Sequence, residues 1–131
     1  MAGELILIVE DNEKNRKLMR DVLQFKGYQI LETETAEEGI RLAQESHPAL
    51  ILMDLQLPGM DGIAALVHLR ADPRTKPIPV IAVTASAMTH DRQRILAAGF
   101  DGYQTKPIGV KEFLEVVRQV LDRHPGPGGD A

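Results

Sequence analysis

Five side chains that could bind a cation and move a phosphoryl group each stand at the end of a short run of strand-forming residues. They are three acids, one hydroxyl and one lysine, at Glu10, Asp11, Asp54, Thr84 and Lys106. Burying a carboxylate such as Asp54, directly after ILM, costs free energy unless a partner compensates its charge. Neighbouring carboxylates also repel each other, which raises their proton affinity unless a cation is present. The residue types therefore predict a cation site built around Asp54.

The predicted cation is Mg²⁺, with Mn²⁺ as a substitute, because hard carboxylate oxygens suit such ions. The chain has no cysteine, which excludes disulfides, thiolate zinc sites and cysteine nucleophiles, and its four histidines are scattered. A lysine can reach a carboxylate or a phosphoryl oxygen, and a threonine hydroxyl can donate to another oxygen. Such a set would transfer a phosphoryl group by positioning and charge neutralisation. Asp54 is then the candidate acceptor nucleophile.

Strands and helices alternate in the pattern that must position these groups. Strands are predicted over 5–9, 28–31, 49–53, 80–83 and 102–105, and helices lie between them and after the last, with Thr35 as a predicted helix cap. Right-handed crossovers then give a five-stranded parallel sheet. The apolar first, third and fourth strands belong at the centre, which predicts a doubly wound, flavodoxin-like α/β fold of strand order 2-1-3-4-5. The candidate residues would meet at the carboxyl ends of the strands.

The bulk composition narrows the class of protein. The chain has 131 residues, 44% hydrophobic and 26% charged, which suits one globular domain. A net charge of -4 gives no electrostatic footprint for direct nucleic-acid binding. No segment is apolar enough to cross a membrane, and the N-terminus lacks the basic region of a signal peptide. We expect a cytoplasmic domain over residues 4–123, followed by a disordered tail at 124–131.

The chain resembles the receiver domains of two-component response regulators over about residues 4–123. The matching motifs, in order, are the acid pair in LIVEDN, the aspartate in LILMDLQLPGMDG, Thr84-Ala85 in VIAVTA, and Tyr103 with Lys106-Pro107 in YQTKPI. The stretches VEDNEKN, LMDLQLP and TASAM are most similar to stand-alone regulators of the alphaproteobacterial cell cycle. Receivers attached to hybrid sensor kinases have much the same motifs, so a fragment of a larger regulator is the alternative.

The resemblance implies a phosphoacceptor signalling domain rather than an enzyme. Asp54 would take its phosphoryl group from a histidine kinase or a histidine phosphotransfer protein. Asp11, Asp54 and the main-chain carbonyl of Gln56 would bind Mg²⁺ directly. Glu10 would help through water, since many receivers have the shorter aspartate there. Lys106 would pair with Asp54 and then with the phosphoryl group, and its bond to Pro107 would be cis.

The resemblance also implies a switch. Thr84 would move to the phosphoryl group and the Tyr103 ring would turn inward, shifting a pre-existing equilibrium. The fourth helix, fifth strand and fifth helix would then contact a downstream protein. Gln56 and Ser86 would tune the lifetime of the phosphorylated state. Direct nucleic-acid or membrane contacts are not expected, and the chain would be a monomer or a weak homodimer.

Other functions fit these residues less well. A phosphatase of the haloacid dehalogenase type needs a second acid two residues after its aspartate, where this chain has Gln56. A flavin or dinucleotide carrier needs a glycine-rich first turn, which VEDNEKN is not. Asp54 could also be a simple cap, but that role does not explain the four matching residues around it. A receiver that acts only as a scaffold would not need the intact acid pair, Asp54, Thr84 and Lys106.

Overall fold

A computed structural model of the chain describes residues 3–85 and 89–124, without the side chains of 89–91. The predicted tail, apart from His124, lies outside the described residues, as does Ser86.

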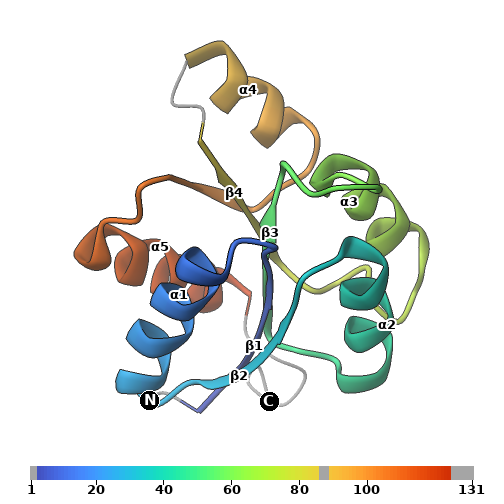
Figure 1. The fold of residues 1–131 in the computed structure, drawn as a ribbon. Coiled ribbons are helices and arrows are strands. Elements are labelled where there is room, and N and C mark those ends of the chain that lie inside the picture. Colours follow the sequence, from blue (N-terminus) through green and yellow to red (C-terminus); the bar gives the residue numbers. More distant parts are fainter. Residues whose placement is uncertain (1–2, 86–88, 125–131) are drawn as a thin grey trace.

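Ten elements alternate along the chain, as the sequence predicts (Figure 1). They are β1 (Leu5–Val9), α1 (Glu13–Phe25), β2 (Gln29–Thr33), α2 (Ala36–Ser46), β3 (Leu50–Asp54), α3 (Gly62–Ala71), β4 (Val80–Thr84), α4 (Thr89–Ala97), β5 (Gly102–Thr105) and α5 (Val110–Arg123). All neighbouring strands are parallel, in the order β2-β1-β3-β4-β5. The predicted doubly wound α/β fold is therefore confirmed.

Two apolar layers hold the sheet between the helices. Figure 1 shows α1 and α5 on one side of the sheet and α2 and α3 on the other. Alternate strand residues serve the two layers: Ile6 and Ile8 pack with α1 and α5, whereas Leu7 and Val9 pack with α2, α3 and Ile95 of α4. Every residue of β3 and β4 is buried, while β2 and β5 are only partly buried. The apolar strands are central because both of their faces are covered.

The second strand differs from its predicted bounds of 28–31. The amide of Tyr28 still donates to the Leu23 carbonyl of α1 at 3.2 Å, so the strand begins one residue later. It also continues through Glu32 and Thr33, which pair in register with Ile8 and Val9 of β1. An edge strand can carry such polar residues, and here Arg16 and Arg20 of α1 pair with Glu32.

Thr35 caps α2, as predicted. Its side-chain oxygen accepts from the amide of Glu38 at 3.2 Å. We expect Thr35→Ala to lower the free energy of unfolding by about 1 kcal/mol, because that amide loses its partner. Urea unfolding measures the change. Thr35→Ser keeps the hydroxyl and should cost much less, and an equal loss in both variants would contradict the capping role.

No helix in the described ranges, 3–85 and 89–124, has the length and apolar character needed to cross a membrane.

Candidate functional site

The three acids meet at one edge of the sheet, where β1 and β3 end. Glu10 and Asp11 directly follow β1, and Asp54 is the last residue of β3. One carboxylate oxygen from each lies within 4.8 Å of the other two. The register explains this meeting, because Val9 of β1 stands opposite Met53, the residue before Asp54. The parallel sheet therefore concentrates three negative charges at a single point.

Asp54 is almost fully buried, at 1% exposure, and both of its oxygens are hydrogen-bonded. Oδ1 accepts from the amide of Gln56 at 3.0 Å, and Oδ2 accepts from Nζ of Lys106 at 3.1 Å. The backbone at Gly62 lies close to the backbone of Asp54, because a Cβ added to Gly62 would lie 2.7 Å from the Asp54 carbonyl oxygen. A glycine is required there because α3 begins against the end of β3.

Glu10 is the other buried acid, with no exposed surface. Its Oε2 accepts from the amide of Asn12 at 3.1 Å. Burial, together with the neighbouring Asp54 carboxyl, raises the pKa of Glu10 from 4.5 to about 7, although the Asn12 amide and Lys106 oppose the shift. The carboxyl therefore titrates near neutrality.

Lys106 supplies the positive charge between the two buried acids. Its Nζ lies 3.1 Å from Oδ2 of Asp54 and 3.1 Å from Oε1 of Glu10. Burial alone would lower the pKa of Lys106, but its hydrogen bonds to Glu10 and Asp54 outweigh this and raise it above the usual value. The Lys106 amide donates to the Thr84 carbonyl at 2.8 Å, and the Lys106–Pro107 bond is cis. The Lys106 ammonium thus contacts two carboxylates, and the exposed Asp11 lies beside them, so the acids of the cluster outnumber this lysine.

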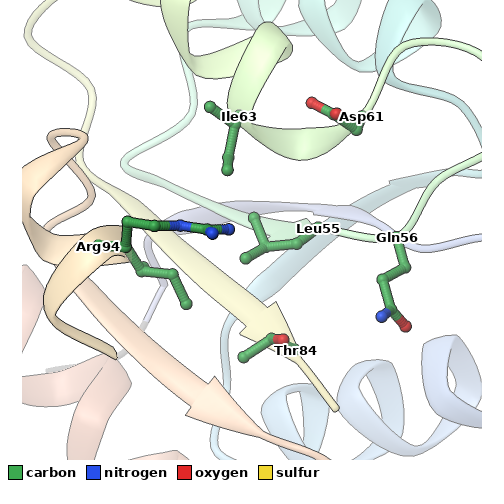
Figure 2. A pocket seen from close by; sticks show the side chains of 7 residues that line it. Leu55, Gln56, Asp61, Ile63, Thr84 and Arg94 are labelled. Carbon is green, nitrogen blue, oxygen red and sulfur yellow. The ribbon is translucent and has the colours of Figure 1, made fainter. Parts of the chain in front are cut away.

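Thr84 and Gln56 border a cavity of about 310 Å³ beside this cluster. The cavity lies between the loop after β3, the end of β4 and α4, and Figure 2 shows Arg94 extending from α4 toward Leu55. Its lining is Leu55, Gln56, Asp61, Ile63, Thr84, Arg94 and Ile95. Thr84 is buried, whereas Gln56 is exposed. The cavity leaves open space next to Thr84.

Tyr103 lies in the middle of β5, before the end of the strand. It pairs with Ala82 in the sheet, two residues before Thr84, and it is half-buried. The guanidinium of Arg92 on α4 lies 5.0 Å from the centre of its ring. The ring therefore connects β5 to α4.

Arg92 and Arg94 were not among the residues predicted from the sequence. Both lie on a helix whose predicted apolar face was weak, and their partners are distant in sequence. The sequence offered one signal, a pair of cations two residues apart shortly after the VTA stretch. Such a pair is also typical of a solvated helix face.

Residues 6–118 match the family described as the response regulator receiver domain. The chain therefore belongs to this family of two-component signalling proteins. It is 46% identical over 116 residues to the polar-differentiation response regulator DivK of Brucella ovis, covering 88% of this chain and 94% of DivK. The predicted family is confirmed, and the match to DivK agrees with the predicted similarity to stand-alone regulators.

Solved receiver structures have the same fold. One is the receiver domain of a sensor histidine kinase from Pseudomonas aeruginosa, with a magnesium ion coordinated in its active-site cleft. It matches with a TM-score of 0.84 and 33% sequence identity, and the match covers 92% of this chain and 99% of that chain. Another is a CheY-like receiver domain protein from Methanospirillum hungatei, with a TM-score of 0.85 and 29% identity, covering 97% and 100%.

Proposed function

We propose that the chain is a cytoplasmic response regulator that accepts a phosphoryl group on Asp54 in a Mg²⁺-dependent reaction. The donor is a histidine kinase or a histidine phosphotransfer protein. The observation that carries this proposal is the buried Asp54 at a strand end, bonded to Lys106 and within 4.8 Å of two further acids. Membership of the receiver family supports it.

The donor set fits Mg²⁺. Asp11, Asp54 and the Gln56 carbonyl would hold the ion, and Glu10 would act through water. All are hard oxygen donors, which Mg²⁺ prefers. When bound, the ion neutralises charge on the phosphoryl oxygens. The magnesium ion in the Pseudomonas aeruginosa receiver supports this assignment.

The residues of the chain then divide the work of phosphoryl transfer. A carboxylate oxygen of Asp54 forms a bond to phosphorus, while the bond from phosphorus to the donor's imidazole nitrogen breaks and the nitrogen keeps the electron pair. Lys106, already 3.1 Å from Oδ2 of Asp54, neutralises part of the charge on the transferred group. The amide of Gln56 fixes the other Asp54 oxygen. Catalysis is thus positioning and electrostatics.

The output is a switch through α4, β5 and α5 to a downstream protein. Thr84 approaches the phosphoryl group and Tyr103 turns inward, while Gln56 and Ser86 set the lifetime of the phosphorylated state. The Arg92–Tyr103 contact supports this route, because it joins α4 to β5. The chain works as a monomer or a weak homodimer.

Intact mass spectrometry after incubation with acetyl phosphate and Mg²⁺ tests the function. We expect one added phosphoryl group, lost when EDTA removes the metal. A folded, Mg²⁺-bound protein that gains nothing would contradict acceptance from this small donor and would require the kinase-dependent reaction to be shown instead. Addition that persists in EDTA would contradict the metal requirement.

Mg²⁺ affinity should rise with pH through about 7. Glu10 has a raised pKa, so it is protonated below about 7 and must lose its proton for the site to carry its full charge. One released proton makes the dissociation constant rise by up to about tenfold for each pH unit below that value. Calorimetric Mg²⁺ titrations over a pH series measure it.

Glu10→Gln provides the control for this pH dependence. The amide has the same size but does not titrate near neutrality, so its weaker Mg²⁺ binding should change little between about pH 6 and 8. An equally steep profile in Glu10→Gln would assign the proton to another group.

A further inference from the structure

Among the residues that the structure describes, none makes a side-chain contact that fixes the direction of Asp11. It is exposed, and within the described ranges its carboxylate makes no hydrogen bond or ion pair. Asp54 and Glu10, in contrast, are held by amides and by Lys106. The orientation of Asp11 toward the cluster therefore depends on the peptide groups on either side of it.

Arg16 of α1 binds the carbonyl oxygens of both neighbours of Asp11. Its guanidinium Nη1 donates to the Glu10 carbonyl at 3.0 Å, and its amide donates to the Asn12 carbonyl at 3.0 Å. The amide bond belongs to the first turn of the helix and would form with any residue except proline. The bond to Glu10 needs the arginine side chain.

Glu32 of β2 holds the guanidinium in place. Nε of Arg16 donates to Oε1 of Glu32 at 3.0 Å, and the Arg16 side chain is only 16% exposed. A planar guanidinium can serve two acceptors at once in a fixed geometry, which a lysine ammonium on a flexible stem does less well. Arg16 thus joins the loop after β1 to the neighbouring strand.

We infer that Arg16 is a positioning residue of the metal site: it fixes the Glu10–Asp11 peptide so that the Asp11 carboxylate faces Asp54. The inference rests on the proposed function, which places Mg²⁺ on these carboxylates. Mutation of groups that orient metal ligands from outside the coordination sphere typically lowers metal affinity by about 10- to 100-fold.

Charge and position predict opposite effects when Arg16 is removed. Loss of a nearby cation would by itself favour Mg²⁺ binding, because the ion would meet less positive charge. Loss of the carbonyl contact would loosen Asp11 and weaken binding. The sign of the change in Mg²⁺ affinity therefore separates the two roles.

The test compares Arg16→Met and Arg16→Lys with Arg20→Met. Arg20 lies on the same helix and contacts both oxygens of Glu32, at 3.0 and 2.9 Å, but has no contact with Glu10. Calorimetric titration with Mg²⁺ at one pH gives each dissociation constant, and thermal unfolding shows whether each variant is folded. We expect Arg16→Met to weaken binding about tenfold. Arg16→Lys should also weaken it despite keeping the charge, and Arg20→Met should stay within about twofold of the wild type.

Several outcomes would overturn the inference. Unchanged or tighter binding in Arg16→Met would leave Arg16 as a surface charge. An equal loss in Arg20→Met would assign the effect to Glu32 and the packing of α1 on β2. If Arg16→Met does not fold, wild-type affinity in Arg16→Lys would overturn it. A wild-type protein that binds no Mg²⁺ would instead overturn the proposed function, and the inference with it.

Discussion

Replacing Asp54 with asparagine should abolish phosphorylation by acetyl phosphate. The asparagine side chain has nearly the same shape and can still accept from the Gln56 amide, which lies 3.0 Å from Oδ1. It has no carboxylate oxygen with which to attack phosphorus. Intact mass spectrometry in Mg²⁺ should therefore show one phosphoryl group on the wild type and none on Asp54→Asn, with both proteins folded by circular dichroism.

Asp61→Asn is the matched control for this loss. Asp61 is the N-cap residue directly before α3, and its Oδ1 accepts from the amide of Ala64 at 2.8 Å. Asparagine caps helices as well as aspartate does, so this variant should fold and be phosphorylated like the wild type. A phosphoryl group on Asp54→Asn, or its loss from Asp61→Asn alone, would place the acceptor elsewhere.

The arrangement of strands was predictable because it depends on patterns that are local in the chain. Runs such as LILIV and VIAVT are apolar throughout, and such strands need cover on both faces, which places them at the centre of the sheet. The strand order then brings Glu10, Asp11 and Asp54 together without further information. The edge strand β2 was predicted less accurately. Its last residues are polar, and the side chains that pair with Glu32 lie on α1.

The side-chain pairs that complete the site were not predictable in the same way. Arg16 with Glu32 and Arg92 with Tyr103 join residues on different elements. Local periodicity places each residue on a helix face but does not show which distant residue it meets. Many surface ion pairs contribute little to stability, so charge alone did not distinguish Arg16 from the other cations of its helix.

The acid cluster also bears on stability. Two buried carboxylates face one ammonium, and the third acid is exposed beside them. A domain selected only for stability would place apolar residues at such strand ends. The raised pKa of Glu10 is a direct sign of this unfavourable crowding, since the protonated form relieves it. In the metal-free protein, stability should therefore fall as Glu10 ionises between about pH 4.5 and 7.

Lys106→Met should make this crowding worse and so reveal what the lysine contributes. With Nζ removed, Asp54 and Glu10 lose their shared partner while both remain buried. We expect the metal-free variant to lose about 2 kcal/mol of unfolding free energy near neutral pH. Removing one partner of a buried ion pair can cost more than this, but here Glu10 can take up a proton, which offsets part of the cost. Mg²⁺ should bind more tightly, because no ammonium competes for the carboxylates, and saturating Mg²⁺ should restore most of the lost stability.

Under the proposed function, Lys106→Met should be phosphorylated slowly, because Asp54 and the proposed metal ligands remain. It should not show the change in Tyr103 fluorescence that we expect when the ring turns inward. Urea unfolding with and without Mg²⁺, calorimetric titration and mass spectrometry measure these effects. Lys111→Met, at an exposed position on α5, is the control and should match the wild type in all of them. Removing a cation that competes with Mg²⁺ should tighten Mg²⁺ binding. Weaker Mg²⁺ binding in Lys106→Met would therefore contradict competition and show that the lysine orders the carboxylates.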